Sequence, residues 1–335
     1  MATNYEKEED DEAFRKATKK YEEIVSTLPH GRHWMTDQLD LHQYKGYWLA
    51  SGTLKGVIFI HDLFTTQSTD IFLATSPKTG TTWFRALIFT TMNRSRYEFS
   101  SHPLLNTGPH DCFPLLDSYI SQNESISNLK TSPSPRLFST HLPYDLFPKS
   151  ITDSSCRFVY VCRNAKDVLV SKWFFMNKLR SKDLPRLSLE EAFELFCEGI
   201  SHDGPFWDHV LGYWRTSLES PEKILFLKYE EMKREPVVHL KRLAEFLGQP
   251  FSAQEESEGV VREIIKLCSF KNLSNLEVNQ NSAQNFSNQL IVDNRFFFRK
   301  GEVGDWKNHL TSEMIKCLDQ ITEEKLHGSG LTFHV

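Results

Sequence analysis

The chain has 335 residues, of which 39% are hydrophobic and 25% charged, and its formal net charge is −5. This balance is typical of a globular protein and excludes a largely disordered one, while the net negative charge argues against a nucleic-acid partner. The acidic start, MATNYEKEEDDEAFRK, lacks the apolar core of a secretory signal, and no apolar run is long enough to span a bilayer. We therefore expect a cytoplasmic protein without a membrane partner.

The predicted elements alternate between helices and short apolar strands. Apolar residues at helical spacing mark residues 11 to 28, and strand-like runs follow at 70 to 75, 136 to 140, 157 to 163 and 223 to 229. Further helical patterns lie at about 82 to 93, 165 to 178, 188 to 200, 206 to 218, 231 to 247 and 311 to 326. The polar, Asn- and Gln-rich stretch 279 to 299 predicts a long loop, and long loops inside compact domains tend to be functional.

The strand-like runs are apolar on both alternating faces, as expected for parallel strands covered by helices on both sides. We therefore predict an α/β fold with a doubly wound parallel sheet flanked by helices, similar to that of P-loop NTPases. We expect one large domain over residues 45 to 335, with residues 1 to 44 forming an acidic segment and a helix packed on that domain.

The six cysteines are scattered along the chain, with no Cys-x-x-Cys pair and no histidine at metal-ligand spacing. This pattern predicts neither a disulfide framework nor a metal site.

The stretch SPKTGTTW, residues 76 to 83, lies between the first apolar run and the helical pattern that follows it. Gly80 permits a tight turn and a close approach of the backbone to a ligand. The helix N-terminus offers unpaired N–H groups, and Lys78 adds a full positive charge, so the stretch predicts a phosphate-binding loop. Its lysine precedes the glycine and the first glycine of a Walker loop is absent, which disfavours a nucleoside triphosphatase.

Four segments together resemble the signature regions of the cytosolic sulfotransferases. They are PKTGTTW at 77 to 83, THLP at 140 to 143, VYVCRNAKDVLVSKW at 159 to 173, and FFRKGEVGDWKNHLT at 297 to 311. They follow the family's order and spacing, and the resemblance covers the chain from residue 45 to 335. The stretch GPFWDHVLGYW, 204 to 214, looks more like the plant branch of the family than the animal branch.

The resemblance implies transfer of a sulfuryl group from 3′-phosphoadenosine 5′-phosphosulfate (PAPS) to a hydroxyl group of a small molecule, without a metal. PAPS carries phosphate groups at two ends of a ribose and so requires two anion sites. The first is implied for the loop formed by Lys78, Thr79, Gly80, Thr81, Thr82 and Trp83. The second, for the 3′-phosphate, is implied for Arg163, Ser171, Arg299, Lys300 and Gly301. Trp83 is expected to stack on adenine, and Tyr229 to form a hydrogen bond with it.

His141 and Lys78 are the residues expected to carry the chemistry. A hydroxyl group must lose its proton as it attacks sulfur, and a histidine is a suitable base at neutral pH. His141 follows a predicted strand, within the THLP segment. Lys78 would stabilise charge on the departing phosphate oxygen.

The sequence says less about the molecule that receives the sulfuryl group. We expect an apolar slot lined by aromatic residues such as Phe113, Tyr144, Phe174 and Phe175, suited to a flavonoid, a hydroxyjasmonate or a brassinosteroid-like compound. Ser139 stands where animal members of the family commonly have lysine, and Ser76 stands where a larger apolar or aromatic residue is commoner.

Two other classes of protein remain open on sequence alone. A P-loop kinase would keep the fold but needs a lysine after the glycine and an acidic residue for Mg²⁺. A protein that only binds the nucleotide would keep the loop but would not need His141.

The segment KNHLTSEMIK, residues 307 to 316, aligns with the short dimerisation segment of animal relatives. Lys307 and Thr311 match it, but Ser312 replaces a valine and Lys316 replaces a glutamate. Because an apolar contact and a charge partner are both lost, we expect a monomer.

Overall fold

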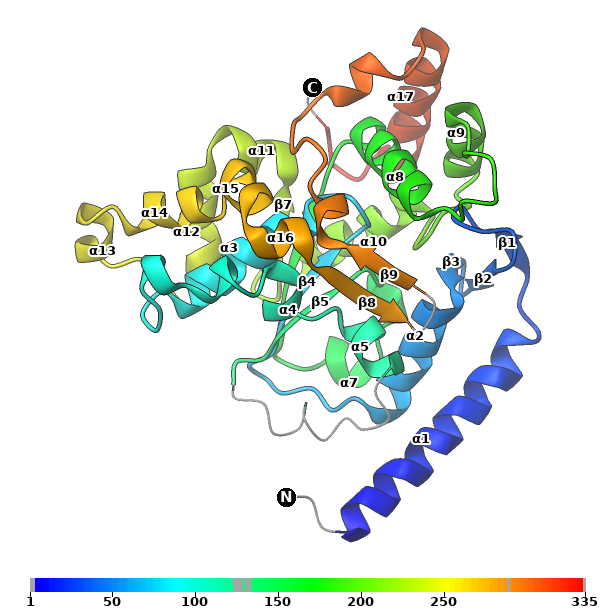
Figure 1. Ribbon diagram of the computed structural model, residues 1–335, viewed down its shortest axis with the longest axis horizontal. Coiled ribbons are helices and arrows are strands. Elements are labelled where there is room, and N and C mark those ends of the chain that lie inside the picture. Colours follow the sequence, from blue (N-terminus) through cyan, green and yellow to red (C-terminus); the bar gives the residue numbers. More distant parts are fainter. Residues whose placement is uncertain (1–3, 123–128, 130–133, 288–289, 334–335) are drawn as a thin grey trace.

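The computed structural model describes residues 4–122, 129, 134–287 and 290–333. Its centre is a parallel sheet (Figure 1). The sheet has four strands in the order β5-β4-β6-β7. The strands are β4 (Ile71–Thr75), β5 (Leu137–Thr140), β6 (Arg157–Cys162) and β7 (Ile224–Lys228). Each matches a strand expected from the sequence, and the parallel α/β fold is confirmed. The chain leaves β4 for β5 on one side and returns to β6 on the other. Open α/β sheets bind ligands at such a reversal, at the carboxyl ends of the strands.

Alternating residues of the strands pack into two separate cores. Phe72, Phe158 and Tyr160 belong to one core, whereas Leu73 and Val159 belong to the other. The first core includes α2 (Ser51–Leu63), α10 (Phe206–Glu219) and α17 (Ser312–Leu326). The second includes α3 (Thr81–Asn93), α12 (Pro236–Phe246) and α14 (Val260–Leu267). The sheet is therefore covered on both faces, as the doubly apolar strands predict.

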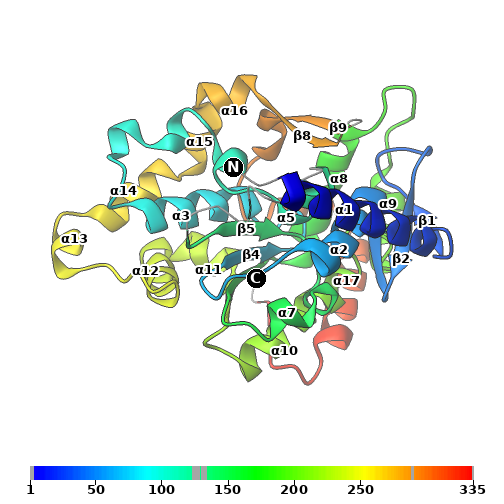
Figure 2. The same ribbon diagram turned by 90° about the horizontal axis from the view of Figure 1, so that it is seen from below.

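The N-terminal part consists of α1 (Asn4–Val25) and a small antiparallel sheet. Its strands are β1 (His30–Arg32), β2 (Asp40–Tyr44) and β3 (Tyr47–Ala50). Helix α1 packs on α2, where the ring centroids of Phe14 and Phe59 lie 4.7 Å apart; the two helices lie next to each other in Figure 2. The expected boundary at residue 45 falls in the turn between β2 and β3, which pair with each other.

The remaining helices surround the sheet. They are α4 (Pro109–Cys112), α5 (Leu116–Gln122), α7 (Lys149–Thr152), α8 (Ala165–Leu179), α9 (Leu189–Cys197), α11 (Tyr229–Arg234), α13 (Ala253–Ser257), α15 (Phe270–Asn275) and α16 (Glu277–Asn281). None of the helices in the described ranges combines the length and the apolar character that a membrane crossing requires.

Two expected elements differ from the structure. The helix expected over 231 to 247 is two helices, because Pro236 at the start of α12 cannot continue the helix before it. The expected loop at 279 to 299 was wrong, since it contains a hairpin of β8 (Ala283–Ser287) and β9 (Leu290–Asp293). Buried Val292 anchors this hairpin. The sequence did not indicate this hairpin, because its side chains are mostly polar. Backbone hydrogen bonds between strands form regardless of the polarity of side chains that point to solvent.

Candidate active site

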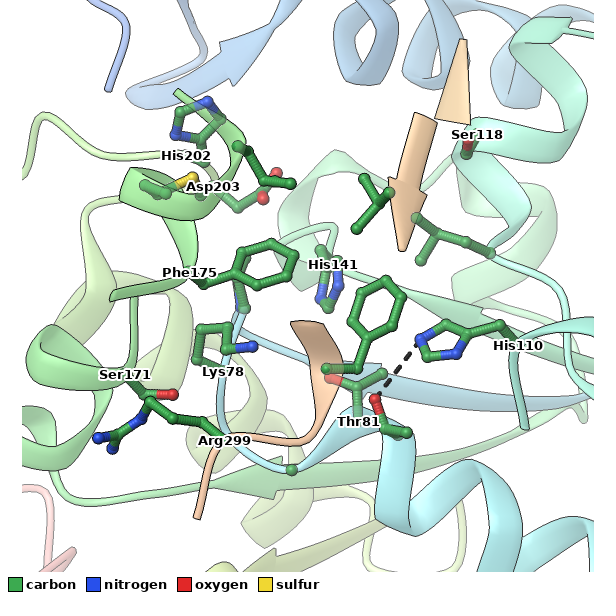
Figure 3. A pocket seen from close by; sticks show the side chains of 18 of the residues that line it. Lys78, Thr81, His110, Ser118, His141, Ser171, Phe175, His202, Asp203 and Arg299 are labelled. Carbon is green, nitrogen blue, oxygen red and sulfur yellow. Dashed lines mark hydrogen bonds between the residues drawn. The ribbon is translucent and has the colours of Figure 1, made fainter. Parts of the chain in front are cut away.

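The carboxyl ends of the central strands open into one cavity of about 1260 Å³. A turn follows Thr75 at the end of β4. His141 follows β5, Arg163 follows β6 and Tyr229 follows β7. The cavity wall contains every predicted site residue except Thr79: Lys78, Gly80, Thr81, Thr82, Trp83, His141, Arg163, Ser171, Tyr229, Arg299, Lys300 and Gly301. Segments from both halves of the chain thus meet where the sequence predicted a site (Figure 3).

The turn after β4 has the geometry of a ligand-binding loop. Lys78 and Gly80 adopt positive φ angles of 75° and 117°, and Gly80 is the N-cap of α3. A Cβ atom on residue 80 would lie 2.7 Å from the ring of Tyr229, so the turn requires glycine for space as well as for conformation. Helix α3 begins at Thr81, and the N–H groups of its first turn have no acceptor within the helix. An anion fits this position.

Thr79 is the exception within the loop. Its side chain is fully buried, and its hydroxyl oxygen lies 2.9 Å from the carbonyl oxygens of both Ser76 and Val161, which share its single proton. The second bond ties the loop to β6. Thr79 does not line the cavity, and its hydroxyl group holds the loop in shape.

Lys78 places an unpaired ammonium group in the cavity. Among the described residues it forms no hydrogen bond or ion pair, and its Nζ lies 3.9 Å from the ring centroid of Phe175. Burial, together with the nearby charges of Arg299, Arg163 and Lys178, lowers the pKa of Lys78 to about 7. An ammonium group at this position without an anionic partner indicates that the ligand supplies the negative charge.

The cations at the other end of this cluster are positioned by two aspartates that the sequence analysis did not identify. Asp305 accepts hydrogen bonds of 2.5 Å from both Arg299 and Lys300. Burial opposes its charge, but these bonds hold the pKa of Asp305 well below its usual range. Asp167 lies 3.5 Å from Arg163 and accepts hydrogen bonds from the backbone of the loop that contains Asp305. The Nε atoms of Arg163 and Arg299 are buried and have no partner among the described residues.

Tyr229 and Gly301 form the wall between these cations and the loop after β4. The hydroxyl group of Tyr229 donates a 3.0 Å hydrogen bond to the carbonyl of Gly301, so the donor expected to reach adenine is already used. The ring of Tyr229 lies edge to face with that of Trp83, with centroids 5.5 Å apart. Gly301 has φ 65°, and a Cβ there would lie 2.5 Å from the ring of Phe270. Ser171 lines the same region, and its hydroxyl group has no hydrogen-bond partner within the described chain.

His141 is oriented through both its ring and its backbone. Its Nδ1 lies 2.8 Å from the carbonyl oxygen of Thr75, and a carbonyl can only accept, so Nδ1 carries the proton. Burial lowers the pKa of His141 to about 3, so the ring is neutral and Nε2 keeps a lone pair. The backbone carbonyl of His141 accepts a 2.9 Å hydrogen bond from His209, whose other ring nitrogen bonds to Tyr160. A neutral histidine with a free Nε2 can accept a proton.

Arg85 and Asp117 also line the cavity near His141, and the sequence analysis did not identify them. Arg85 donates a 2.6 Å hydrogen bond to Ser139, the residue that stands where a lysine is common in animal sulfotransferases. Burial lowers the pKa of Arg85 to about 10 and raises that of Asp117 to about 6. Arg85 lies four residues after Thr81, one turn along α3, and this spacing was a signal that it shares a face with the loop.

The prediction of which aromatic residues line the apolar part of the cavity was mostly wrong. Phe175 lines it, but Phe113, Tyr144 and Phe174 do not. Phe113 is fully buried in the core around α3, and Tyr144 packs on Phe158 and Tyr213. The apolar wall is formed instead by Met176, Leu179, Leu290, Val292 and Phe297, among others. Two of these residues belong to the β8–β9 hairpin, which was expected to be a loop.

No group of three or more metal-ligating side chains occurs in the part of the chain that the structure describes.

Comparison with known proteins agrees with this geometry. A family model described as a sulfotransferase domain matches residues 68–330. Cytosolic sulfotransferase 17 of Arabidopsis thaliana is 43% identical over 317 residues, which cover 95% of this chain and 91% of that protein. Flavonol 3-sulfotransferase of Flaveria bidentis is 43% identical over 312 residues, covering 92% and 99% of the two chains.

Solved structures also match. The crystal structure of an Arabidopsis thaliana putative steroid sulphotransferase has a TM-score of 0.72 at 38% identity, covering 93% of this chain and 94% of that one. A mouse sulfotransferase complexed with PAP has a TM-score of 0.66 at 28% identity, covering 86% and 95%.

Proposed function

Because the chain belongs to the sulfotransferase family and is a PAPS-dependent sulfotransferase, we propose that His141 and Lys78 carry the transfer of the sulfuryl group to a hydroxyl group of a small apolar metabolite. One observation carries this proposal: a neutral histidine with a free Nε2 lines the same cavity as an unpaired lysine. PAPS supplies the sulfuryl group and leaves as adenosine 3′,5′-bisphosphate (PAP).

The residues in the cavity fit a polyanion such as PAPS. Lys78 and the first turn of α3 would hold the 5′-phosphosulfate, and Arg163, Ser171, Arg299, Lys300 and Gly301 the 3′-phosphate. The buried, unpartnered Nε atoms of Arg163 and Arg299 support the second assignment, because buried N–H donors normally have hydrogen-bond partners. Trp83 provides a flat surface for the adenine base.

His141 acts in this proposal as the general base. Its Nε2 takes the proton of the attacking hydroxyl group, and its Nδ1–H bond to Thr75 keeps the ring in the required tautomer. Lys78 places its charge beside the oxygen that becomes negative as the sulfuryl group leaves. The hydrogen bond from His209 to the backbone carbonyl of His141 positions the base.

The acceptor molecule is proposed to be apolar and hydroxylated, such as a flavonoid, a hydroxyjasmonate or a brassinosteroid-like compound. The apolar wall formed by Phe175, Met176 and Leu179 supports this class, as do the names of the relatives, which include a flavonol sulfotransferase and a putative steroid sulphotransferase. Several relatives are named cytosolic sulfotransferases, and we propose the cytosol as the location of this protein.

The test is incubation of the protein with PAPS and a panel of hydroxylated metabolites, read by mass spectrometry. We expect products that have gained a sulfuryl group, with one PAP formed for each. Phosphate transfer from ATP would indicate a kinase, and tight PAP binding without any product would indicate a nucleotide-binding protein. Either result would overturn the proposed function.

We also propose that the protein is a monomer, because Ser312 and Lys316 replace the valine and glutamate of the dimerisation segment of animal relatives. Both residues belong to α17. Light scattering is expected to give the mass of one chain. A stable dimer whose interface contains residues 307 to 316 would contradict this.

A further inference from the structure

A turn formed by Ser201, His202 and Asp203 lies at the far side of the cavity from Ser171 and Arg299. Figure 3 shows His202 and Asp203 on one side of His141 and Phe175, and the cationic residues on the other. His202 and Asp203 line the cavity and are only 8% and 7% exposed. Asp203 has a positive φ of 59°, which is uncommon for a residue other than glycine.

The turn is held rigidly from two directions. Lys172 of α8 is fully buried, and its ammonium group donates hydrogen bonds to the Ser201 hydroxyl at 3.0 Å and the His202 carbonyl at 2.6 Å. On the other side, the N–H of Asp203 donates to the carbonyl of Trp48 at 2.8 Å, and Trp48 donates to the carbonyl of Gly204 at 2.7 Å. The backbone around Asp203 is therefore fixed, which limits where its side chain can lie.

The Asp203 carboxyl group has no hydrogen-bond partner in the described part of the chain, and its Oδ1 is buried. Buried polar groups nearly always have a partner, and leaving one unpaired costs roughly 1–3 kcal/mol. The ammonium group of Lys172 is near enough to influence Asp203 electrostatically, but its hydrogen bonds go to Ser201 and His202. Burial outweighs this attraction and raises the pKa of the carboxyl group.

His202, the residue before Asp203, adds an unpaired hydrogen-bond donor to the same turn. His33 Nδ1 accepts a hydrogen bond from the N–H of Met35, so the proton of His33 is on Nε2. That Nε2–H donates to Nε2 of His202 at 3.0 Å. Burial lowers the pKa of both rings, so both are neutral, and the remaining proton of His202 is on Nδ1. This Nδ1–H is buried and has no acceptor among the described residues.

We propose that His202 and Asp203 form a polar subsite that recognises a second hydroxyl group on the acceptor molecule, remote from the hydroxyl group that is sulfated. A hydroxyl group can both donate to the Asp203 carboxyl oxygen and accept from an N–H such as that of His202, so its chemistry matches both groups. An ammonium group on the acceptor fits less well, since Lys172 already places a positive charge beside Asp203 and His202 presents a donor rather than an acceptor. Figure 3 shows Phe175 between the two polar ends, and Met176 also lines the cavity. The preferred acceptor is therefore a diol with an apolar body.

This inference rests on the proposed sulfotransferase function, and its test compares acceptors that differ by one hydroxyl group. The probes are para-phenylphenol with its para,para′-diol, and a naphthol with the corresponding naphthalenediol. Because a site built to bond a hydroxyl group rejects the analogue that lacks it, we expect the wild type to favour the better-fitting diol in kcat/KM by about 10- to 100-fold. Asp203→Leu should remove this preference while leaving kcat/KM for the mono-hydroxyl partner within about twofold.

Asp183→Asn is the matched control, because Asp183 is exposed and does not line the cavity; it should retain the preference. PAP affinity, measured by calorimetry, should be unchanged in both variants. A wild type without diol preference, or an Asp203→Leu variant that loses the same factor on both members of a pair, would overturn the subsite and leave the sulfotransferase function standing. Preference for an amine-bearing phenol over the diol would also overturn it. If the wild type sulfates none of the four phenols nor any compound of the wider panel, both proposals fail together.

Discussion

The Nδ1 atom of His141 donates a hydrogen bond to the backbone carbonyl of Thr75, so the proposed base is tied to the strand that leads into the proposed phosphate-binding loop. Thr75 ends β4 and His141 directly follows β5, and the register of these neighbouring parallel strands brings Ala74 opposite Thr140. The relative position of base and loop is therefore set by the sheet rather than by flexible segments.

Removal of the base should separate catalysis from nucleotide binding. His141→Ala and His141→Gln are expected to bind PAP with near wild-type affinity, because the loop after β4 does not depend on the imidazole. Turnover should fall by roughly 10²–10⁴-fold, and more for an aliphatic alcohol than for an acidic phenol that is already partly ionised. Single-turnover rates with two such acceptors measure this. If activity survives, Asp117, which lines the same cavity, becomes the candidate base.

Nucleotide binding should depend on pH through Lys78. In the free protein its pKa is lowered to about 7, and a bound polyanion must raise it again because it favours the charged form. PAP affinity should therefore be constant with respect to Lys78 below that pH and fall as the pH rises above it, with one proton taken up on binding. Calorimetry between about pH 7.5 and 9 avoids titration of the phosphates, whose second pKa is about 6. Lys78→Arg keeps its charge and should bind without this dependence; an unchanged slope in that variant would argue against Lys78 as its source.

The assignment of the 3′-phosphate can be tested with two nucleotides. Arg299→Ala should weaken PAP binding by about 10- to 150-fold, since hydrogen bonds to charged groups contribute about 1.5–3 kcal/mol. Binding of adenosine 5′-phosphate, which lacks the 3′-phosphate, should hardly change. Arg295→Ala is the control, because Arg295 pairs with Asp293 at the surface and does not line the cavity. Equal losses for both nucleotides would place Arg299 elsewhere.

Gly301 and Gly304 provide a matched pair that separates backbone strain from steric conflict. Both have positive φ angles, 65° and 85°. A Cβ on residue 301 would lie 2.5 Å from the ring of Phe270, whereas one on residue 304 would approach only the end of the Lys307 side chain, at 4.0 Å. Gly304→Ala should cost about 1 kcal/mol of folding free energy, and Gly301→Ala should cost more and weaken PAP binding as well. Denaturant unfolding and calorimetry together test this, and equal effects would contradict it.

The stability of the sheet edge should depend on the buried ion pair of Asp70 and Arg136. Arg136 donates to both carboxylate oxygens, at 2.7 and 2.5 Å, and both residues are almost completely buried. Arg136→Met leaves Asp70 without its positively charged partner and should lower the free energy of unfolding by about 3–5 kcal/mol. Asp70→Leu combined with Arg136→Met should recover much of that loss. Lys16→Ala, which breaks an exposed pair with Glu12, should change it by less than about 0.5 kcal/mol. A small effect of Arg136→Met in urea titration would show that the pair contributes little.

The sequence by itself determined the strands, the turn after the first strand and the residues at the strand ends, including Lys78, His141 and Arg163. These depend on short-range rules: which segments are apolar on both faces, where glycine allows a tight turn, and which edge of a parallel sheet its carboxyl ends share. The resemblance to the sulfotransferases added the distant Arg299, Lys300 and Gly301, which no local pattern connects to that edge.

Only the tertiary structure decided which way the side chains at this edge point and what pairs with them. The hydroxyl group of Thr79 points toward the carbonyl of Val161, and that of Tyr229 donates a hydrogen bond to the carbonyl of Gly301. Neither contact could be predicted, because the partners come from segments far away in the chain. For the same reason Asp305 could not be identified as the residue that positions Arg299 and Lys300. An apolar residue in the sequence fits a core and a cavity wall equally well, so Phe113 and Phe175 could be told apart only once their neighbours were in place.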